Sequence, residues 1–213
     1  VWVLGAGLAG ASLAREWADR GVAVIVLDEQ PAPAQGASGL PVGLFTPHGA
    51  RQRPELNVLT LAGLRHMNQL ARRFLREGED WSPCGVWEQL MPDRRGKLPL
   101  SPATADDADP TDPGLTIGHL QDGFPGHPHP AVSHPRAGWI KPQALVKALL
   151  KHPLIEVRPN AKVTRIAHHP HQPAKRWQAL GSGGEVLAEA AVASWATWWP
   201  RRCTSWPWQP RLA

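Results

Sequence analysis

The chain has 213 residues and a mass of 23.2 kDa, enough for one ordinary domain, or for one domain and part of another. Hydrophobic residues make up 42% and charged residues 19%, which excludes wholesale disorder, and the 20 glycines and 23 prolines disfavour a helical bundle. The net charge of +5 and the pI near 9.8 suit a polyanionic partner, but the basic residues are dispersed, so charge alone identifies no partner.

The cysteines and the hydropathy pattern bear on the compartment. Cys84 and Cys203 are too few for a disulfide framework and too far apart for a zinc knuckle, which favours a reducing, cytoplasmic location. No run approaches the ~18 apolar residues of a membrane span. The chain opens at Val1 without an initiator Met or a charged leader. We therefore expect that a few residues are absent or trimmed, and that no membrane is involved.

The first 28 residues alternate strand and helix signals around a glycine motif. Residues 1–4 are apolar and rich in strand formers, and G-x-G-x-x-G follows at once at residues 5–10. Apolar residues then recur at helical spacing up to Arg20, and a second apolar run at 22–27 ends in Asp28. Strand, glycine turn, helix, strand and acid in this order predict a dinucleotide-binding βαβ unit.

Each residue of this motif has a physical task. Gly5 permits the tight turn, Gly7 lets the backbone approach a pyrophosphate, and Gly10 lets the helix pack closely on the strand. Ala6, inside the turn, is assigned to the cofactor with them, and the helix N-terminus offsets the phosphate charge. Asp28 would accept hydrogen bonds from an adenosine ribose, with the glutamate after it as the competing acid, and this favours FAD or NAD over NADP. The alternative is a glycine-rich turn without a ligand.

The segment after Asp28 distinguishes the two dinucleotides. It is small and glycine-rich where a nicotinamide enzyme usually begins its next helix, and it contains Ala32-Pro33-Ala34-Gln35-Gly36-Ala37-Ser38-Gly39, then Gly43, Pro47 and His48. This stretch resembles the FAD-dependent oxidoreductases of the D-amino-acid-oxidase and glycine-oxidase type. It is most similar to the flavin domain of the bifunctional enzymes that make 5-methylaminomethyl-2-thiouridine at the tRNA wobble position, although Leu40-Pro41 departs from their pattern.

The resemblance implies FAD as the cofactor and roles for several residues. Ser38 and Gly39 would contact the FAD pyrophosphate and the isoalloxazine side, where the alternative is a plain loop turn. The backbone at Val163 would lie near the adenine. His48 and Arg136 fall in segments that approach the flavin, although a loop histidine and a surface arginine are simpler interpretations. No catalytic acid or base can be named.

The middle of the chain gives weaker signals. A 3.6-residue period over 54–77 predicts an amphipathic helix whose arginines are solvated or, alternatively, face tRNA. Its predicted inward stripe is Leu56, Leu59, Gly63, Met67, Leu70, Ala71 and Phe74. Residues 85–88 predict a strand, and 101–135, which lack any period, predict an extended loop. The histidines at 127–129 and 168–171 have no Cys, Asp or Glu at ligand spacing, so no metal site is expected.

The far part of the chain returns to alternating elements. Pro142 suits the first position of a helix, and the pattern from Gly138 to Leu150 resembles the segment by which these flavoproteins return to the FAD domain. Strands are predicted at 154–157 and 161–166. A hairpin turning at Gly181-Ser-Gly-Gly184 and a strand beginning at Ala190 follow.

These elements predict an α/β fold, a Rossmann-like FAD-binding domain with part of an α+β substrate domain, incomplete at the C-terminus. The FAD-binding domain is assigned residues 1–50 and 137–194, and the partial substrate domain, with a Pro/Gly/His-rich loop, residues 51–136. Residues 195–213 hold five of the eleven tryptophans and no period. We interpret this tail as the product of a shifted reading frame near residue 193, with a membrane-binding or partner-binding tail as the alternative.

The resemblance also implies a function. The chain would be an FAD-dependent oxidoreductase acting on a secondary amine, the carboxymethylaminomethyl group of a wobble uridine in tRNA. Hydride transfer to the flavin and hydrolysis of the resulting imine would release the carboxymethyl arm as glyoxylate. The alternatives are an oxidase or dehydrogenase of a free D-amino acid or glycine, and an inactive truncated fragment. The oligomeric state stays open.

Overall fold

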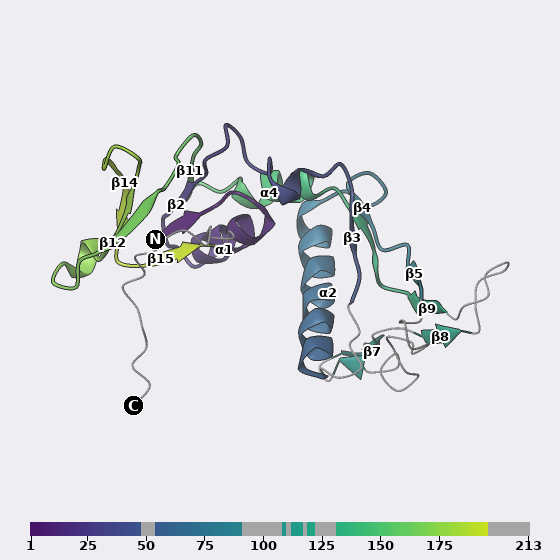
Figure 1. Cartoon of the computed structure of the whole chain (residues 1–213). Coiled ribbons are helices and arrows are strands. Elements are labelled where there is room, and N and C mark those ends of the chain that lie inside the picture. The colour runs from purple at the N-terminus through teal and green to yellow at the C-terminus, as the bar shows by residue number, and fades with distance from the viewer. Residues whose placement is uncertain (48–53, 91–107, 110–111, 117–118, 122–130, 196–213) are drawn as a thin grey trace, which may run out of the picture. The chain divides into compact units, whose positions relative to one another are not determined.

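A computed structural model describes most of the chain and divides it into two compact units. The described residues are 1–47, 54–90, 108–109, 112–116, 119–121 and 131–195. One unit combines residues 1–39 with the chain from residue 149 onward, and the other takes residues 40–148 (Figure 1). No helix in the described ranges is long and apolar enough to cross a membrane.

The first unit contains a four-stranded parallel sheet in the order β11-β2-β1-β15. Its strands are β1 (Trp2–Leu4), β2 (Val24–Leu27), β11 (Ile155–Arg158) and β15 (Ala193–Trp195). The helix α1 (Leu8–Asp19) connects β1 to β2. Most of β1 and β2 is buried, which explains why both read as continuous apolar runs instead of alternating ones. The order is the 3-2-1-4 arrangement of doubly wound sheets, which reverses between β1 and β15.

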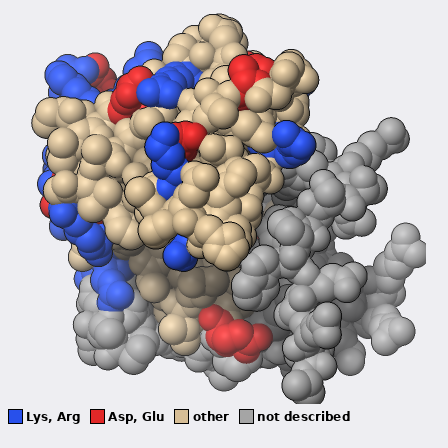
Figure 2. Space-filling model, turned by 90° about the vertical axis from the view of Figure 1, so that its left-hand side faces the viewer, with Lys and Arg blue, Asp and Glu red and all other residues tan. Residues whose placement is uncertain are grey.

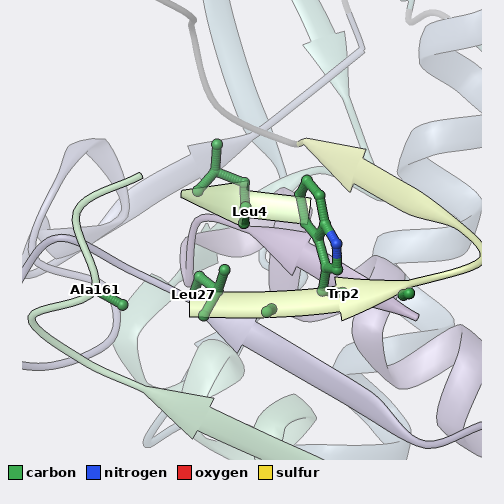
Figure 3. Packing of buried hydrophobic residues seen from close by; sticks show 7 residues of the cluster. Trp2, Leu4, Leu27 and Ala161 are labelled. Atoms are coloured by element: carbon green, nitrogen blue, oxygen red, sulfur yellow. The ribbon is translucent and has the colours of Figure 1, made fainter. Parts of the chain in front are cut away.

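An antiparallel sheet packs against this parallel sheet. It runs β12-β13-β14, with β12 (Arg165–His168), β13 (Trp177–Leu180) and β14 (Val186–Ala190), and a 3-10 turn η2 (Pro173–Lys175) precedes β13. A shared core cluster joins the two sheets, and Figure 3 shows Trp2 and Leu4 of β1 beside Leu27 of β2. The remaining members are small, namely Ala161, Ala179, Ala188 and Ala190. The indole N–H of Trp2 donates to the carbonyl of Trp177 at 3.3 Å, so the largest side chain of this cluster is also hydrogen-bonded.

In its described residues, the second unit contains short antiparallel sheets and a long helix. The helix is α2 (Pro54–Phe74). The sheets, in order, are β3 (Gly43–Phe45), β10 (Gly138–Ile140) and β4 (Trp81–Ser82); β5 (Val86–Gln89), β9 (Ala131–His134) and β8 (His119–Gln121); and the pair β6 (Ala108–Asp109) and β7 (Asp112–Thr116). The helix α4 (Pro142–Leu150) follows β10 and begins at its proline, as predicted.

The burial pattern of α2 corrects the predicted stripe. Leu59 is 68% exposed and Gly63 is exposed, whereas Leu61 is 1% and Leu64 5% exposed. The predicted stripe was wrong by about half a turn at the start of the helix, because Leu56, Leu59 and Leu61 fit several helical faces equally well. Only the packing partners of α2 select one face.

The predicted loop at 101–135 was also wrong in part. Strands β6 to β9 lie within it, and β9 pairs antiparallel with β5 and β8. The partner of β9 in β5 is more than forty residues away, from Gln89 to Ala131, so the pairing leaves no local period in the sequence. The predicted strand at 85–88 is confirmed by β5, shifted by one residue.

The domain limits found in the structure differ from the predicted ones. Residues 40–47 and 137–148 cluster with the second unit, because β3 and β10 pair with each other and β10 pairs with β4. The strand predicted at 161–166 starts only at Arg165, since the N–H of Ala161 turns to donate to the carbonyl of Asp28 at 2.8 Å. The strand predicted from Ala190 is instead β15, three residues later, and it includes Trp195 of the predicted tail. Residues 196–213 lie outside the described ranges.

Candidate dinucleotide-binding site

The glycine turn lies at the carboxyl end of β1, beside the point where the strand order reverses. Gly5 has φ +97°, a left-handed conformation that favours glycine, and its N–H donates to the carbonyl of Leu27 at 2.7 Å. The turn is therefore tied to the end of β2. Ligands of doubly wound sheets bind outside the carboxyl ends of the strands at such a reversal.

Gly10 and Gly7 allow two close approaches around this turn. A Cβ on Gly10 would overlap the carbonyl oxygen of Gly5, so α1 keeps its position only with glycine there. A Cβ on Gly7 would lie 3.1 Å from the hydroxyl oxygen of Ser38. The predicted reason for Gly10, close packing of helix on strand, agrees with this geometry.

The carboxylate of Asp28 binds two backbone N–H groups. Oδ2 accepts from Ala6 at 2.5 Å, and Oδ1 accepts from Gln30 at 2.8 Å. Asp28 therefore joins the glycine turn to the segment after β2, a task that spacing alone did not indicate. A carboxylate offers about four acceptor positions, so both oxygens retain capacity for ribose hydroxyls.

Ser38 and Gly39 lie next to the turn although they are about thirty residues away in sequence. The hydroxyl of Ser38 accepts from the N–H of Leu8 at 3.0 Å, and it thereby caps α1, whose preceding residue Gly7 has no side chain to do so. A Cβ on Gly39 would lie 2.8 Å from the carbonyl oxygen of Ala34. Ala34 itself has φ +61° and donates its N–H to Ala6 at 3.0 Å. An alanine carries no sequence signal for that conformation, so the contribution of Ala34 was missed.

The first turn of α1 retains donors for an anion. Leu8 donates to Ser38 and Ala11 donates to Gly7, but within the described ranges the N–H groups of Ala9 and Gly10 have no acceptor. Unpaired N–H groups and the positive end of the helix dipole favour phosphate at this position. The missing Cβ of Gly7 keeps the approach open. These residues fit the pyrophosphate of a dinucleotide.

Val163 lies in the segment that follows the carboxyl end of β11. The segment is held by the Ala161 bond to Asp28 and by Asn160, at φ +55°, which donates its N–H to Gln30 at 3.0 Å. The side chain of Val163 packs against the core cluster that contains Leu27. In the described part of the chain its backbone N–H and C=O have no hydrogen-bond partner. Asn in a left-handed turn was the signal that sequence reasoning passed over.

The remaining candidates are not placed near this turn. His48, Cys203 and the histidines at 127–129 lie outside the described residues. Arg136 is exposed in the second unit, and its carbonyl accepts from Asn68 at 3.2 Å. Cys84 is an exposed free thiol. No group of three His, Cys, Asp or Glu side chains suited to a metal ion occurs among the described residues.

Comparison with known proteins decides the family. The model of the family "FAD dependent oxidoreductase" matches residues 1–201. The chain belongs to this family. The predicted resemblance and α/β fold are therefore confirmed, and FAD is the cofactor on which the family depends.

Individual relatives give the same result at finer detail. The chain is 40% identical over 196 residues to the tRNA 5-methylaminomethyl-2-thiouridine biosynthesis bifunctional protein MnmC of Verminephrobacter eiseniae, covering 88% of the chain and 31% of the relative. It is 41% identical over 216 residues to the protein of the same name from Paracidovorax citrulli, covering 99% and 33%. The chain thus spans about a third of the length of these curated relatives.

Solved structures agree on the fold. Glycine oxidase from Geobacillus kaustophilus matches with a TM-score of 0.61 at 16% identity, over 92% of this chain and 54% of that one. At this identity the match concerns the fold alone.

Proposed function

We propose that this chain binds FAD at the glycine turn and takes part in FAD-dependent oxidation of a secondary amine on a tRNA wobble uridine, in the cytoplasm. One observation carries the cofactor proposal, namely that Gly5, Gly7, Gly10, Asp28 and Ser38 converge on the start of α1 with two N–H groups of its first turn unpaired. The family match supports FAD over NAD as the dinucleotide.

The residues divide the binding task between them. The first-turn N–H groups of Ala9 and Gly10 would hold the pyrophosphate, and the Ser38 hydroxyl, which already accepts from Leu8, would donate its own hydrogen to it. Asp28 would accept from the ribose while bracing Ala6. The backbone of Val163 would pair with the adenine edge, and Gly39 would leave room for the flavin side. When bound, FAD supplies the acceptor for two electrons and a hydride.

The proposed substrate is the carboxymethylaminomethyl group of the wobble uridine. Oxidation of its N–CH₂ bond to an imine removes two electrons and two hydrogens, and water then cleaves the imine to leave the aminomethyl-uridine and glyoxylate. The printed names of the relatives, which place them in 5-methylaminomethyl-2-thiouridine biosynthesis, support this substrate. The structural similarity to glycine oxidase keeps free glycine or a D-amino acid as the second candidate.

The first experiment measures flavin retention. The purified 213-residue chain is incubated with FAD and then freed of unbound flavin. Bound flavin is measured by its absorbance at about 450 nm, which is a property of the cofactor itself. We expect retention in the parent chain and loss in Gly7→Val, while Gly63→Val, at an exposed position with open space around it, keeps the flavin. If all three proteins retained flavin to the same extent, the site would be refuted. A colourless parent chain would instead support the inactive-fragment alternative.

The second experiment identifies the substrate. Under anaerobic conditions, flavin-loaded protein is mixed with tRNA carrying the carboxymethylaminomethyl-uridine, with glycine, or with a D-amino acid. Bleaching by the tRNA alone, with loss of the carboxymethyl group detected by nucleoside mass spectrometry, is the expected result. Bleaching only by a free amino acid would replace the tRNA substrate by the second candidate.

A further inference from the structure

One surface of the first unit concentrates positive charge. Basic residues are dispersed over most of the chain, but residues 158–176 contain five Lys or Arg, three His and no Asp or Glu. This segment forms β12 and the turn before β13, on the left of Figure 1, and Figure 2 shows that side of the molecule with blue side chains and several red ones between them. The hairpin is therefore a candidate surface for an anion.

The hairpin directs its apolar side chains inward and its charges outward. Ile166 and Trp177 pack against the core cluster, and Ala179, opposite Ile166, is buried in it. Arg165 belongs to the opposite face of β12, because neighbouring residues of a strand point to opposite sides, and it is exposed. At the other end of the hairpin Arg176 is exposed, and its carbonyl accepts from His169 at 2.8 Å.

Three cations of this surface have no acidic partner among the residues that the structure describes. Glu189 of β14 is bound by Lys175 at 2.7 Å and by Gln178 at 2.7 Å, which together lower the pKa of Glu189. Gln178 in turn contacts His169 at 2.9 Å. Glu156 is paired with Arg158. The side chains of Lys162, Arg165 and Arg176 form no ion pair or hydrogen bond with any described residue. Besides Glu189, the acidic residue of this sheet is Glu185, in the turn between β13 and β14.

The hairpin also exposes an aromatic-imidazole stack. The rings of His168 and Trp177 lie 4.4 Å apart between centroids, with an angle of 37° between their planes. His168 is exposed, and His171 lies in the same turn. His168 is opposite Trp177 in the register and shares the strand face of Ile166, so this stack lies on the other face of β12 from Arg165 and is not counted in the cationic surface.

The other basic segment of the chain is a weaker candidate. In α2 and the turn after it, Arg76 pairs with Glu79 at 2.5 Å and with Asp80 at 3.6 Å, and Arg73 lies over the ring of Phe74. Those cations are partly neutralised or occupied within their own segment. The tRNA-facing role considered for α2 in the sequence therefore suits the β12–β13 hairpin better.

We propose that the β12–β13 hairpin, through Lys162, Arg165 and Arg176, docks the phosphate backbone of RNA. The identity of that RNA as tRNA rests on the proposed function, whereas the charge argument does not. Arg176 directly precedes Trp177, which pairs with His168, three residues or about 10 Å along the strand from Arg165, so Arg165 and Arg176 are spread along the hairpin instead of lying at one point. Such a spread fits a polyanion better than a single phosphate group.

Binding of an unmodified tRNA transcript to the full 213-residue chain tests this surface. Fluorescence anisotropy at increasing salt compares the parent with the double variant Arg165→Gln/Arg176→Gln. Each lost phosphate contact lowers the magnitude of the slope of log K against log salt by about 0.7 to 0.9, so we expect a decrease of about 1.4 to 1.8. Arg165→Lys/Arg176→Lys keeps the charge and is expected to retain most of the affinity.

The matched control removes two cations elsewhere. Arg72→Gln/Lys147→Gln changes the net charge equally at two exposed positions, and it should leave the slope within about 0.3 of the parent value. Equal losses in both double variants, or no loss in either, would overturn the proposal. So would a case in which only the binding of phosphatidylserine vesicles is lost, since that would assign the hairpin to a membrane surface. The assay needs neither flavin nor modified nucleoside, so its failure is distinct from failure of the proposed function.

Discussion

The helices α1 and α2 differ in how they approach their neighbours. α1 buries Gly10, Ala11, Ala14 and Ala18, so its backbone lies close to the parallel sheet. α2 buries Leu61 and Leu64 instead, and it leaves its glycine exposed. Small residues fix the position of a backbone that must present N–H groups, whereas large residues supply apolar area. The candidate site therefore depends on shape at α1, while stability of the second unit depends on side-chain volume.

The largest expected effect separates the two leucines of α2. Leu61→Ala removes a buried side chain and should lower the free energy of unfolding by about 2 to 5 kcal/mol. Leu59→Ala, at 68% exposure, should change it by less than about 0.5 kcal/mol. Urea unfolding followed by circular dichroism measures both. Similar losses of unfolding free energy in the two variants would contradict the observed face and favour the predicted stripe that contains Leu59.

A pair of glycine substitutions compares the two helices directly. Gly10→Ala places a Cβ on the Gly5 carbonyl and should cost about 3 kcal/mol, with loss of bound flavin. Gly63→Ala meets nothing within 4 Å and should stabilise the protein by up to about 1 kcal/mol through helix propensity. We expect thermal unfolding to show that the same substitution lowers stability at Gly10 and raises it at Gly63. If Gly10→Ala is neutral, the close approach of α1 is not required.

Asp28→Asn tests the brace between the turn and β2. An amide can accept from Ala6 or from Gln30 but presents its NH₂ group to the other, so we expect a loss of about 2 kcal/mol and weaker flavin retention. Asp19→Asn, whose carboxylate meets Arg15 at the protein surface, serves as control with an expected change within about 0.5 kcal/mol. Urea unfolding and flavin absorbance are the two measurements. Equal stability of both variants would remove the bracing role.

Ser38→Ala tests the cap supplied to α1 from a distant loop. Loss of the hydroxyl leaves the Leu8 N–H without its partner and should cost about 1 kcal/mol. Ser38→Thr retains the hydroxyl and is expected to recover most of that loss. The comparison is made by chemical unfolding. A threonine variant as unstable as the alanine variant would show that the hydroxyl contributes little.

The smallest expected effect concerns Glu156, whose pKa is lowered by the hydrogen bond from Arg158. A folded-state pKa below the ordinary value contributes stability above that value, and the contribution disappears as the pH falls through the folded pKa. Both side chains are substantially exposed, so the pair is worth at most about 1 kcal/mol and weakens with salt. Glu156→Gln should therefore be less stable than the parent at pH 7 and equally stable in strong acid. A difference that persists in acid would exclude the ion pair as its cause.

The βαβ unit could be predicted from the sequence because its signals come from residues that lie close together in the chain. The apolar runs before Gly5 and Asp28, the glycine spacing and the helical period all reflect residues that interact within thirty positions. The hairpin of β13 and β14 was found for the same reason. In contrast, β9 and β15 pair with strands far away in the chain, and neither pairing leaves a period in the residues around it.

The amino-acid sequence alone specified which residues form the glycine turn, that a parallel βαβ unit surrounds it and that FAD is the family's cofactor. Only the tertiary structure decided that Ser38 caps α1, that Asp28 braces Ala6 and that Ala34 adopts a left-handed conformation beside them. It also decided which face of α2 is buried. Spacing and composition reflect interactions between residues that are near each other in sequence. The contacts named here join segments whose separation in sequence says nothing about their distance in space.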